Sequence, residues 1–311
     1  MSIAIEAVKL KKSVEATKWR AEDRACPVCD SRRREIKGMR GGVAHRNGKG
    51  VKTSVVQCVD CKIIYTNPTL IPESNPYAEE TAEEYFQLHD WDQKIMNGES
   101  LAAFAEGVLG KPGRILELGC GRGELLIGAA NRGWAAYGVE MTEGYAQIAQ
   151  SKGVQIECSS IQECKLLDQR YDLILLAAIL EHLYDPVETL KRVRDALRPG
   201  GLVFIDVPNE SSLTMQIGNL YLRARGRDWV MNLSPTFSPF HVVGFSPASL
   251  SHTLKSVGFR IHKLEVPKWN NALAQGKSLR QKIERLAFGA VQTVGAHIGM
   301  GDGITCWAVR E

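Results

Sequence analysis

The stretch that most constrains the fold of this chain is residues 115–123, which read Ile-Leu-Glu-Leu-Gly-Cys-Gly-Arg-Gly. A short apolar run ends there in glycines at alternate positions, and a helix-forming segment follows from Glu124. This pattern predicts a strand that turns tightly into a helix, because glycine adopts backbone angles that other residues resist. The bare backbone of such a turn also lets a nucleotide-like cofactor approach closely.

Strand and helix patterns alternate along the chain from residue 114 onward. We predict strands at 114–118, 135–140, 154–158, 171–177, 202–207, 259–266 and 304–310, and helices at 123–132, 143–152, 186–197 and 247–257. Such alternation predicts an α/β fold with a doubly wound, mostly parallel seven-stranded sheet covered by helices on both faces.

Composition and breaks in the pattern divide the chain into four parts. We expect a lead-in at 1–20, a metal-binding module at 21–68, a helical linker or lid at 69–111, and a main domain at 112–311 that carries a substrate-cap insertion at 209–244. The module is rich in Gly, Arg and Lys, prolines mark the linker, and Lys111-Pro112-Gly113 ends its helical pattern.

Four of the eight cysteines form two Cys-x-x-Cys pairs, Cys26 with Cys29 and Cys58 with Cys61. Each pair predicts a tight knuckle, and two knuckles make a tetrahedral thiolate site suited to Zn²⁺. Four sulfurs complete the coordination, so the site is expected to be structural rather than catalytic. Redox use of one pair is the alternative.

Polar residues follow the strands where a cofactor site is expected. The glycine spacing, G-x-G-x-G, differs from the G-x-G-x-x-G fingerprint of nicotinamide dinucleotide sites. Glu140 ends the second strand, where a carboxylate accepts both hydroxyls of a ribose, and Met141 offers an apolar surface to an adenine. The fourth strand leads to Glu181 and His182. All these turns lie at the carboxyl ends of parallel strands, where open α/β sheets bind ligands.

Residues 112–207 resemble a class I S-adenosylmethionine-dependent methyltransferase. The matching segments are 116–123, Glu140, 171–172, 180–186 and 197–201. The resemblance implies that the methionine half of the cofactor is lined by Glu117, Gly119, Cys120 and Gly121, that Glu140 binds the ribose, that Met141 and Ile161 flank the adenine, and that Ala177 at the end of the fourth strand also contacts the cofactor. Ser160 stands where many members carry Asp, so Ser160, Gln162 or a backbone carbonyl meets the adenine amino group.

The segment 26–68 is similar to the zinc-ribbon module that begins many methyltransferases of secondary metabolism and surface-sugar biosynthesis. The similarity is carried by both cysteine pairs and by Gln57 through Pro68 around the second pair. Lys62 stands where that module usually has Gly, which is expected to alter the second knuckle slightly.

A hydroxyl acceptor benefits from a base, and histidine is the usual one near neutral pH. We therefore consider His182 and His241 as catalytic candidates; holding a loop and capping or packing are their structural alternatives. The chain lacks the Asp/Asn-Pro-Pro-aromatic segment of base-amino methyltransferases, because it reads Ala-Ala-Ile-Leu at 177–180. The expected substrate is a small metabolite or sugar, with an amine or carbon less favoured than a hydroxyl, and nucleic acid is disfavoured.

The formal net charge of +4 hides a basic N-terminal end, where residues 1–62 hold 15 Lys and Arg against 7 Asp and Glu. Two other functions therefore stay open: an RNA or protein methyltransferase guided by this basic module, and a catalytically silent scaffold. No signal-peptide core or transmembrane run is visible, which favours a cytoplasmic protein. The apolar periodicity at 279–299 predicts a packed helix or a homodimer contact.

Overall fold

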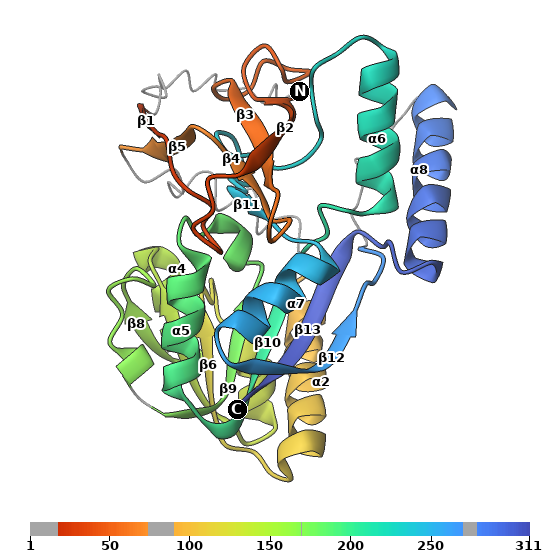
Figure 1. Cartoon of the computed structure of the whole chain (residues 1–311). Coiled ribbons are helices and arrows are strands. Elements are labelled where there is room, and N and C mark those ends of the chain that lie inside the picture. The colour runs from red at the N-terminus through yellow and green to blue at the C-terminus, as the bar shows by residue number, and fades with distance from the viewer. Residues whose placement is uncertain (1–17, 74–89, 169, 270–278) are drawn as a thin grey trace, which may run out of the picture.

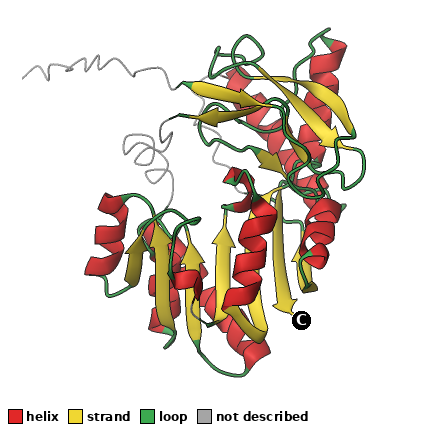
Figure 2. Cartoon of the chain, turned by 60° about the vertical axis from the view of Figure 1, so that its left-hand side comes forward, coloured by secondary structure: helices red, strands yellow, loops and turns green. Residues whose placement is uncertain are grey.

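The computed structural model describes residues 18–73, 90–168, 170–269 and 279–311. Its main feature is a seven-stranded sheet with the order β12-β13-β10-β9-β6-β7-β8 (Figure 1). These strands are β6 (Arg114–Leu118), β7 (Ala135–Glu140), β8 (Gln155–Cys158), β9 (Tyr171–Ala177), β10 (Leu197–Pro208), β12 (Phe259–Glu265) and β13 (Gly303–Arg310). Only β13 runs antiparallel to its neighbours, β10 and β12, so the expected mostly parallel seven-stranded sheet is confirmed (Figure 2).

Helices cover both faces of this sheet. One face carries α2 (Trp91–Leu109), α3 (Glu124–Asn131) and α4 (Glu143–Ser151), and the other carries α5 (Pro186–Ala196) and α7 (Pro247–Ser256). Successive residues of β9 point to opposite faces of the sheet. Leu173 packs in the core on the side of α2, α3 and α4, and Ile174 packs in the core on the side of α5 and α7. A central strand buried on both sides reads as a continuous apolar run, which is why it was recognisable in the sequence.

The cysteine module forms a second layer above the carboxyl ends of the parallel strands (Figures 1 and 2). Its four-stranded sheet has the order β11-β4-β3-β2, and β1 pairs with β5 beside it. The strands are β1 (Trp19–Glu22), β2 (Arg34–Arg40), β3 (Thr53–Cys58), β4 (Ile64–Thr66), β5 (Thr69–Pro72) and β11 (Val243–Gly244).

The segment expected as a cap, 209–244, folds together with the cysteine module. It contains α6 (Leu213–Ala224), its end supplies β11 to one edge of the module sheet, and Trp229 forms a bridge with Met39 at the opposite edge. Both edges of that small sheet are thereby covered, which protects backbone groups that edge strands leave unpaired. The proposed domain boundaries remain predictions.

Two details differ from the sequence-based expectations, one in β10 and one in the linker. The break expected at 198–201 lies inside β10, because Leu197 already pairs with Tyr171 and a bulge separates it from Leu202. The first residues of the expected helical linker, Thr69–Pro72, form the strand β5 and not a helix. Residues 74–89 of the linker lie outside the described residues, and the described helix begins at Trp91. A helix does occupy most of 279–299, as α8 (Leu279–His297), and it packs beside α6 (Figure 1). The homodimer contact stays a prediction.

No helix within the described ranges is both long enough and apolar enough to cross a membrane.

Candidate functional site

The glycine turn connects β6 to α3 in a conformation that L-residues rarely adopt. Gly119, Gly121 and Gly123 have φ angles of 68°, 54° and 79°. The N–H groups of Gly119 and Cys120 both donate to the carbonyl of Val139, at 2.8 and 3.0 Å. A Cβ at position 119 would overlap the Cδ1 atom of Ile179, so the turn lies directly against the segment that follows β9.

Glu140 lies at the end of β7, beside the glycine turn. Its carboxylate accepts hydrogen bonds from the backbone N–H groups of Gly121, at 3.0 Å, and Thr142, at 2.8 Å. Each carboxylate oxygen has a second lone pair, so ribose hydroxyls can still donate to it. The next residue, Met141, is exposed, as an apolar surface for an adenine ring requires.

Glu117 and Cys120 are both buried, and one oxygen of the Glu117 carboxylate lacks a hydrogen-bond partner among the described residues, although Lys94 acts electrostatically on this carboxyl. The Oε2 atom of Glu117 is buried and makes no hydrogen bond, and burial is the main cause that raises the pKa of this carboxyl well above its usual value. An orphaned carboxylate at this position fits the ammonium group of a methionine moiety. The Cys120 sulfur packs instead toward Gly138 in the core, so only the backbone of Cys120 remains for a ligand.

The residues expected near the adenine lie after β8 and β9. The Ser160 hydroxyl donates to Glu163 at 3.0 Å, and the Ile161 side chain packs against the hydrophobic core. The Ile161 carbonyl accepts a hydrogen bond from Arg192 at 2.7 Å, which fixes this turn. Ala177 pairs with Asp206 in the sheet and is half-buried, and the following Ala178 has a φ angle of 55°.

The two candidate histidines meet at a buried carboxylate. Their rings lie 4.9 Å apart in an edge-to-face arrangement, and the Nε2 atom of each is 3.9 Å from Oε1 of Glu181. Burial lowers the pKa of His182 to about 4 and of His241 to about 3, so both imidazoles are neutral near neutral pH. Burial also raises the pKa of the Glu181 carboxyl well above its usual value.

Several residues at this site were not identified from the sequence as candidates. Glu181 was noticed only as part of a motif, while Asp206 and Glu210, at and just beyond the end of β10, were not noticed at all. Burial raises the pKa of both carboxyls to about 6. The sequence signal for Asp206 is an acidic residue at the end of an apolar run, which reads Leu-Val-Phe-Ile-Asp at 202–206; Glu210 has no such signal. At the glycine turn, the guanidinium of Arg122 lies 4.9 Å above the Trp91 ring of α2.

The four module cysteines come together as the two-pair spacing predicts. The Cys26 and Cys61 sulfurs are 3.4 Å apart, the Cys29 and Cys58 sulfurs are 3.6 Å apart, and all four lie within 4.8 Å of one another. Sulfurs around a tetrahedral Zn²⁺ with bonds of 2.3 Å lie about 3.8 Å apart, so the residues fit this ion. Lys62 has a φ angle of 62°, the conformation for which glycine is favoured.

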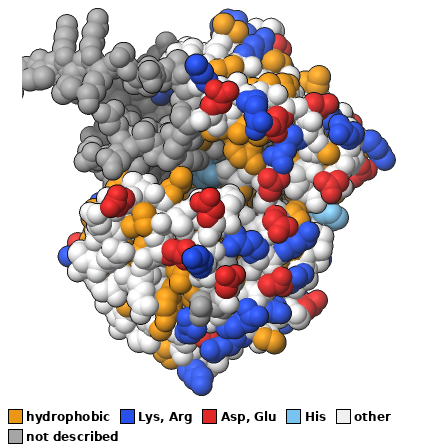
Figure 3. All heavy atoms as spheres, turned by 90° about the vertical axis from the view of Figure 1, so that its left-hand side faces the viewer, with side chains coloured by type: hydrophobic (Ala, Val, Ile, Leu, Met, Phe, Trp, Pro, Cys, Tyr) orange, Lys and Arg blue, Asp and Glu red, His pale blue; other side chains and the backbone are white. Residues whose placement is uncertain are grey.

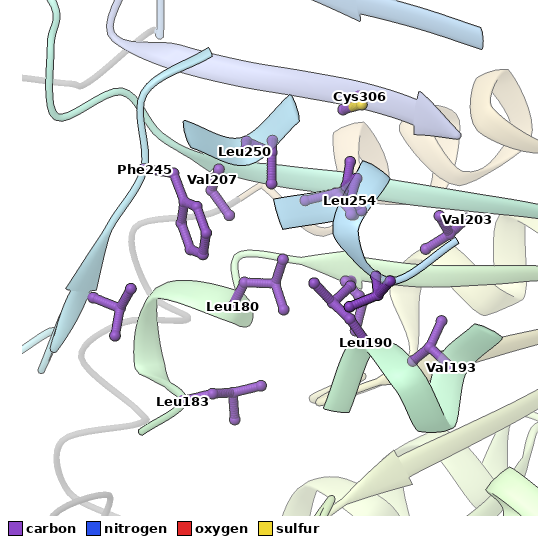
Figure 4. Packing of buried hydrophobic residues seen from close by; sticks show 14 of the residues in the cluster. Leu180, Leu183, Leu190, Val193, Val203, Val207, Phe245, Leu250, Leu254 and Cys306 are labelled. Carbon is purple, nitrogen blue, oxygen red and sulfur yellow. The ribbon is translucent and has the colours of Figure 1, made fainter. Parts of the chain in front are cut away.

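The module is joined to the histidine cluster by a short path of backbone pairs. Val243 of β11 pairs with Tyr65 of β4, which follows the second cysteine knuckle. The neighbouring Val242 donates its N–H to the carbonyl of Glu181 at 2.8 Å. Buried residues on both sides form one hydrophobic cluster, in which Leu180, Leu183 and Phe245 pack together (Figure 4).

A mostly parallel seven-stranded sheet, with a glycine turn after β6 and a carboxylate ending β7, defines the Rossmann-like methyltransferase fold. The family model described as "Methyltransferase domain" matches residues 89–264. This chain belongs to that family and is an S-adenosylmethionine-dependent methyltransferase.

Known proteins resemble the chain over much of its length. It is 26% identical over 173 residues to the ubiquinone biosynthesis O-methyltransferase of Coxiella burnetii, which is 54% of this chain and 72% of that protein. A SAM-dependent methyltransferase from Archaeoglobus fulgidus superposes with a TM-score of 0.51 at 21% identity, covering 75% of this chain and all of that one. The plantazolicin methyltransferase BpumL in complex with a monoazolic desmethylPZN analog and SAH also has a TM-score of 0.51, at 14% identity, covering 76% of this chain and 91% of that one. At these identities the two structures show the shared fold.

Replacement of Gly119 by alanine is expected to destabilise the protein by about 2–3 kcal/mol, combining backbone strain with the overlap on Ile179. Gly133 provides a matched control, because its φ angle is 88° and no atom lies within 4 Å of a Cβ there. The Gly133→Ala variant is expected to lose only about 1 kcal/mol. Chemical denaturation measures both, and adding Ile179→Val should recover part of the loss only in the Gly119 variant. Equal losses in the two alanine variants would contradict the close contact.

Proposed function

We propose that this protein transfers the methyl group of S-adenosylmethionine to a hydroxyl of a small metabolite or sugar. The observation that carries the proposal is the position of the Glu181–His182–His241 cluster, which is joined to the glycine turn through the contact between Ile179 and Gly119. The names of the matching ubiquinone biosynthesis O-methyltransferases support an oxygen acceptor. The reaction forms an O–CH₃ bond, breaks the S–CH₃ bond and leaves S-adenosylhomocysteine, while the hydroxyl proton is released.

We assign the cofactor site to the residues around the glycine turn. Glu117 receives the ammonium group, the backbone of Gly119, Cys120 and Gly121 surrounds the methionine half, and Glu140 accepts the ribose hydroxyls. The remaining contacts are assigned to Met141, Ser160, Ile161 and Ala177. The buried and unpartnered Oε2 atom of Glu117 and the exposed face of Met141 support this arrangement.

His182 and His241 are assigned to activation of the acceptor hydroxyl, and the four module cysteines to a structural Zn²⁺. A Zn²⁺ ion bound there would cross-link the two cysteine knuckles and so stabilise the fold of the module. The thiol of Cys26 receives hydrogen bonds from the backbone at Val28 and Cys29, and that of Cys58 from the backbone at Asp60 and Cys61. Such contacts stabilise thiolate ligands.

The arrangement of charge supports a small acceptor over RNA. The basic run at 32–34 is paired with carboxylates: Arg32 lies 3.7 Å and Arg34 3.0 Å from Asp23, and Arg33 lies 3.3 Å from Asp60. On the face shown in Figure 3, Lys and Arg side chains alternate with Asp and Glu among the described residues. Affinity for a phosphate backbone comes mainly from Lys and Arg that neutralise phosphates, and neighbouring carboxylates reduce the net positive charge available for this.

The full-length protein should produce S-adenosylhomocysteine when it is incubated with S-adenosylmethionine and small phenols or sugars. Mass spectrometry then finds one added methyl group on the acceptor. Matched acceptors whose hydroxyl is already a methyl ether serve as controls and should be inert. Transfer to amines, RNA or protein, with hydroxyl compounds inert, would overturn the proposal, and cofactor binding without any turnover would favour the scaffold alternative.

A further inference from the structure

The carboxylate of Glu181 is the least satisfied polar group of the described residues around the proposed acceptor site. The side chain is 2% exposed, neither of its oxygens makes a hydrogen bond of normal geometry, and among the described residues only the backbone of Glu181 itself interacts favourably with the carboxylate. A buried carboxylate without a partner costs several kcal/mol. Such a group either keeps its proton or is compensated by a cation, so this buried carboxyl is a candidate ligand for a cation.

The spacing around Glu181 is that of ligands around a cation. Its Oε1 atom is 3.9 Å from Nε2 of both His182 and His241, which is too long for a hydrogen bond. One ligand atom from each side chain can be chosen so that all three lie within 4.8 Å of one another. Atoms about 2.1 Å from a common metal lie about 3 Å apart at right angles and about 4.2 Å apart when opposite. The two histidine–carboxylate separations of 3.9 Å fall within this range.

The backbone holds two of these side chains from outside the cluster. The ring of His182 is hydrogen-bonded to the backbone at Pro239 and Phe240. Glu181 is fixed through its own carbonyl, which accepts from Val242 at 2.8 Å, next to His241. The hydrogen bonds to the His182 ring are of the kind that orients histidines which bind metals, whereas the bond to the Glu181 carbonyl fixes only the main chain there.

The surroundings of the cluster carry negative charge. Asp206 and Glu210 both act electrostatically on Glu181, and the Oδ1 atom of Asp206 is also buried without a partner. The Trp269 indole hydrogen-bonds to Asp206, and Asn232 donates to Glu210 at 2.7 Å. Arg40 is the positive group that acts electrostatically on Glu210. Three buried carboxyls and two histidines form an environment that a divalent cation neutralises.

We propose that Glu181, His182 and His241 bind one divalent transition-metal cation beside the methyl-donor site. Two imidazoles and one carboxylate suit first-row ions such as Mn²⁺, Fe²⁺, Co²⁺ or Zn²⁺, and three protein ligands leave coordination positions open. An acceptor hydroxyl bound there loses its proton more readily, and its oxygen is held for attack on the methyl group. This role rests on the proposed function, whereas cation binding itself does not.

The test is a titration with MnCl₂ of the full chain carrying one Zn²⁺ per chain, the amount that the four cysteines hold, with excess zinc removed so that it does not compete for the proposed site; electron paramagnetic resonance follows the free Mn²⁺. Mn²⁺ prefers nitrogen and oxygen ligands, so the four cysteines do not compete for it. The wild-type protein should bind one Mn²⁺ per chain. Glu181→Gln and His241→Gln should each weaken binding at least tenfold, while His252→Gln, which changes an exposed histidine of α7, should not.

A second readout separates ligand loss from misfolding. Mn²⁺ should raise the melting temperature of the wild type and of His252→Gln but leave the two ligand variants unchanged, and a folded Glu181→Gln should be at least as stable as the wild type without metal. If the Glu181→Gln variant does not fold, the Mn²⁺ binding of the His241→Gln variant provides the test of the cation site. Absence of saturable Mn²⁺ binding in the wild type, or equal binding in the variants, overturns the cation site. Intact Mn²⁺ binding without methyl transfer to hydroxyls overturns the proposed function alone.

Discussion

Replacement of Glu140 by alanine is expected to lower the affinity for S-adenosylmethionine by at least about a hundredfold. The proposed contacts are two charge-assisted hydrogen bonds to the ribose, each worth about 1.5–3 kcal/mol. Loss of these two hydrogen bonds accounts for most of the expected decrease in affinity. Every 1.4 kcal/mol of binding free energy corresponds to a factor of ten in affinity. The variant also loses the acceptors of the Gly121 and Thr142 N–H groups, which loosens the glycine turn itself.

Calorimetry with the purified protein measures this change. Glu143→Ala is the matched control, because Glu143 is an exposed glutamate three residues away in the first turn of α4. It removes the same charge and should bind the cofactor normally. Glu140→Gln keeps one acceptor oxygen and should fall between the two. A folded Glu140→Ala variant with wild-type affinity would refute the ribose assignment.

The second large effect is expected on removal of the module metal. Cys58→Ser should abolish zinc binding and destabilise the protein by several kcal/mol, because structural zinc contributes about 10–16 kcal/mol in small zinc-binding peptides. Cys58 ends β3, its N–H donates to the carbonyl of Ile63, and β4 begins at the next residue. Without the knuckle, β4 loses its anchor and its pairing with β11 weakens.

Loss of the second cysteine knuckle is therefore expected to disturb the proposed acceptor site as well. His241 lies two residues before β11, and Val242 is bonded to the Glu181 carbonyl, so a shift of this segment separates His241 from Glu181. Methyl transfer should fall more than cofactor binding, because the glycine turn and Glu140 belong to the large sheet. Elemental analysis, thermal denaturation and calorimetry provide the three measurements.

Cys158→Ser is the control for this experiment, since Cys158 is an exposed cysteine of β8 outside the sulfur cluster. It should retain zinc, stability and activity. Full zinc content in Cys58→Ser, or a zinc-free variant with unchanged methyl transfer, would contradict the structural role of the metal.

The large sheet was predictable because its signals are local. The apolar run at 171–177, the glycine turn after Leu118 and the proline that begins α5 each specify one element within a few neighbouring residues. The right-handed crossover rule then orders the parallel strands with little further freedom. The bulge at 198–201 was missed because Arg-Pro-Gly-Gly reads as a break, whereas burial and pairing of Leu197 begin the strand earlier.

The site was predictable in part, for the same reason. Glu117, Glu140 and the glycines follow from the turn and from the ends of neighbouring strands. The sequence also indicated His182 and His241 one at a time. It did not indicate that they meet, or that Glu181 lies between them, because 59 residues separate the two histidines along the chain.

By itself, the sequence determined the alternating α/β pattern, the glycine turn and the two cysteine pairs, since each depends on residues close in the chain. Only the tertiary structure placed β11 on the cysteine module, buried Glu181 between two histidines and set Asp206 and Glu210 beside them. Those arrangements depend on packing between segments separated by dozens of residues or more, where burial decides which polar groups lose water and therefore need a partner.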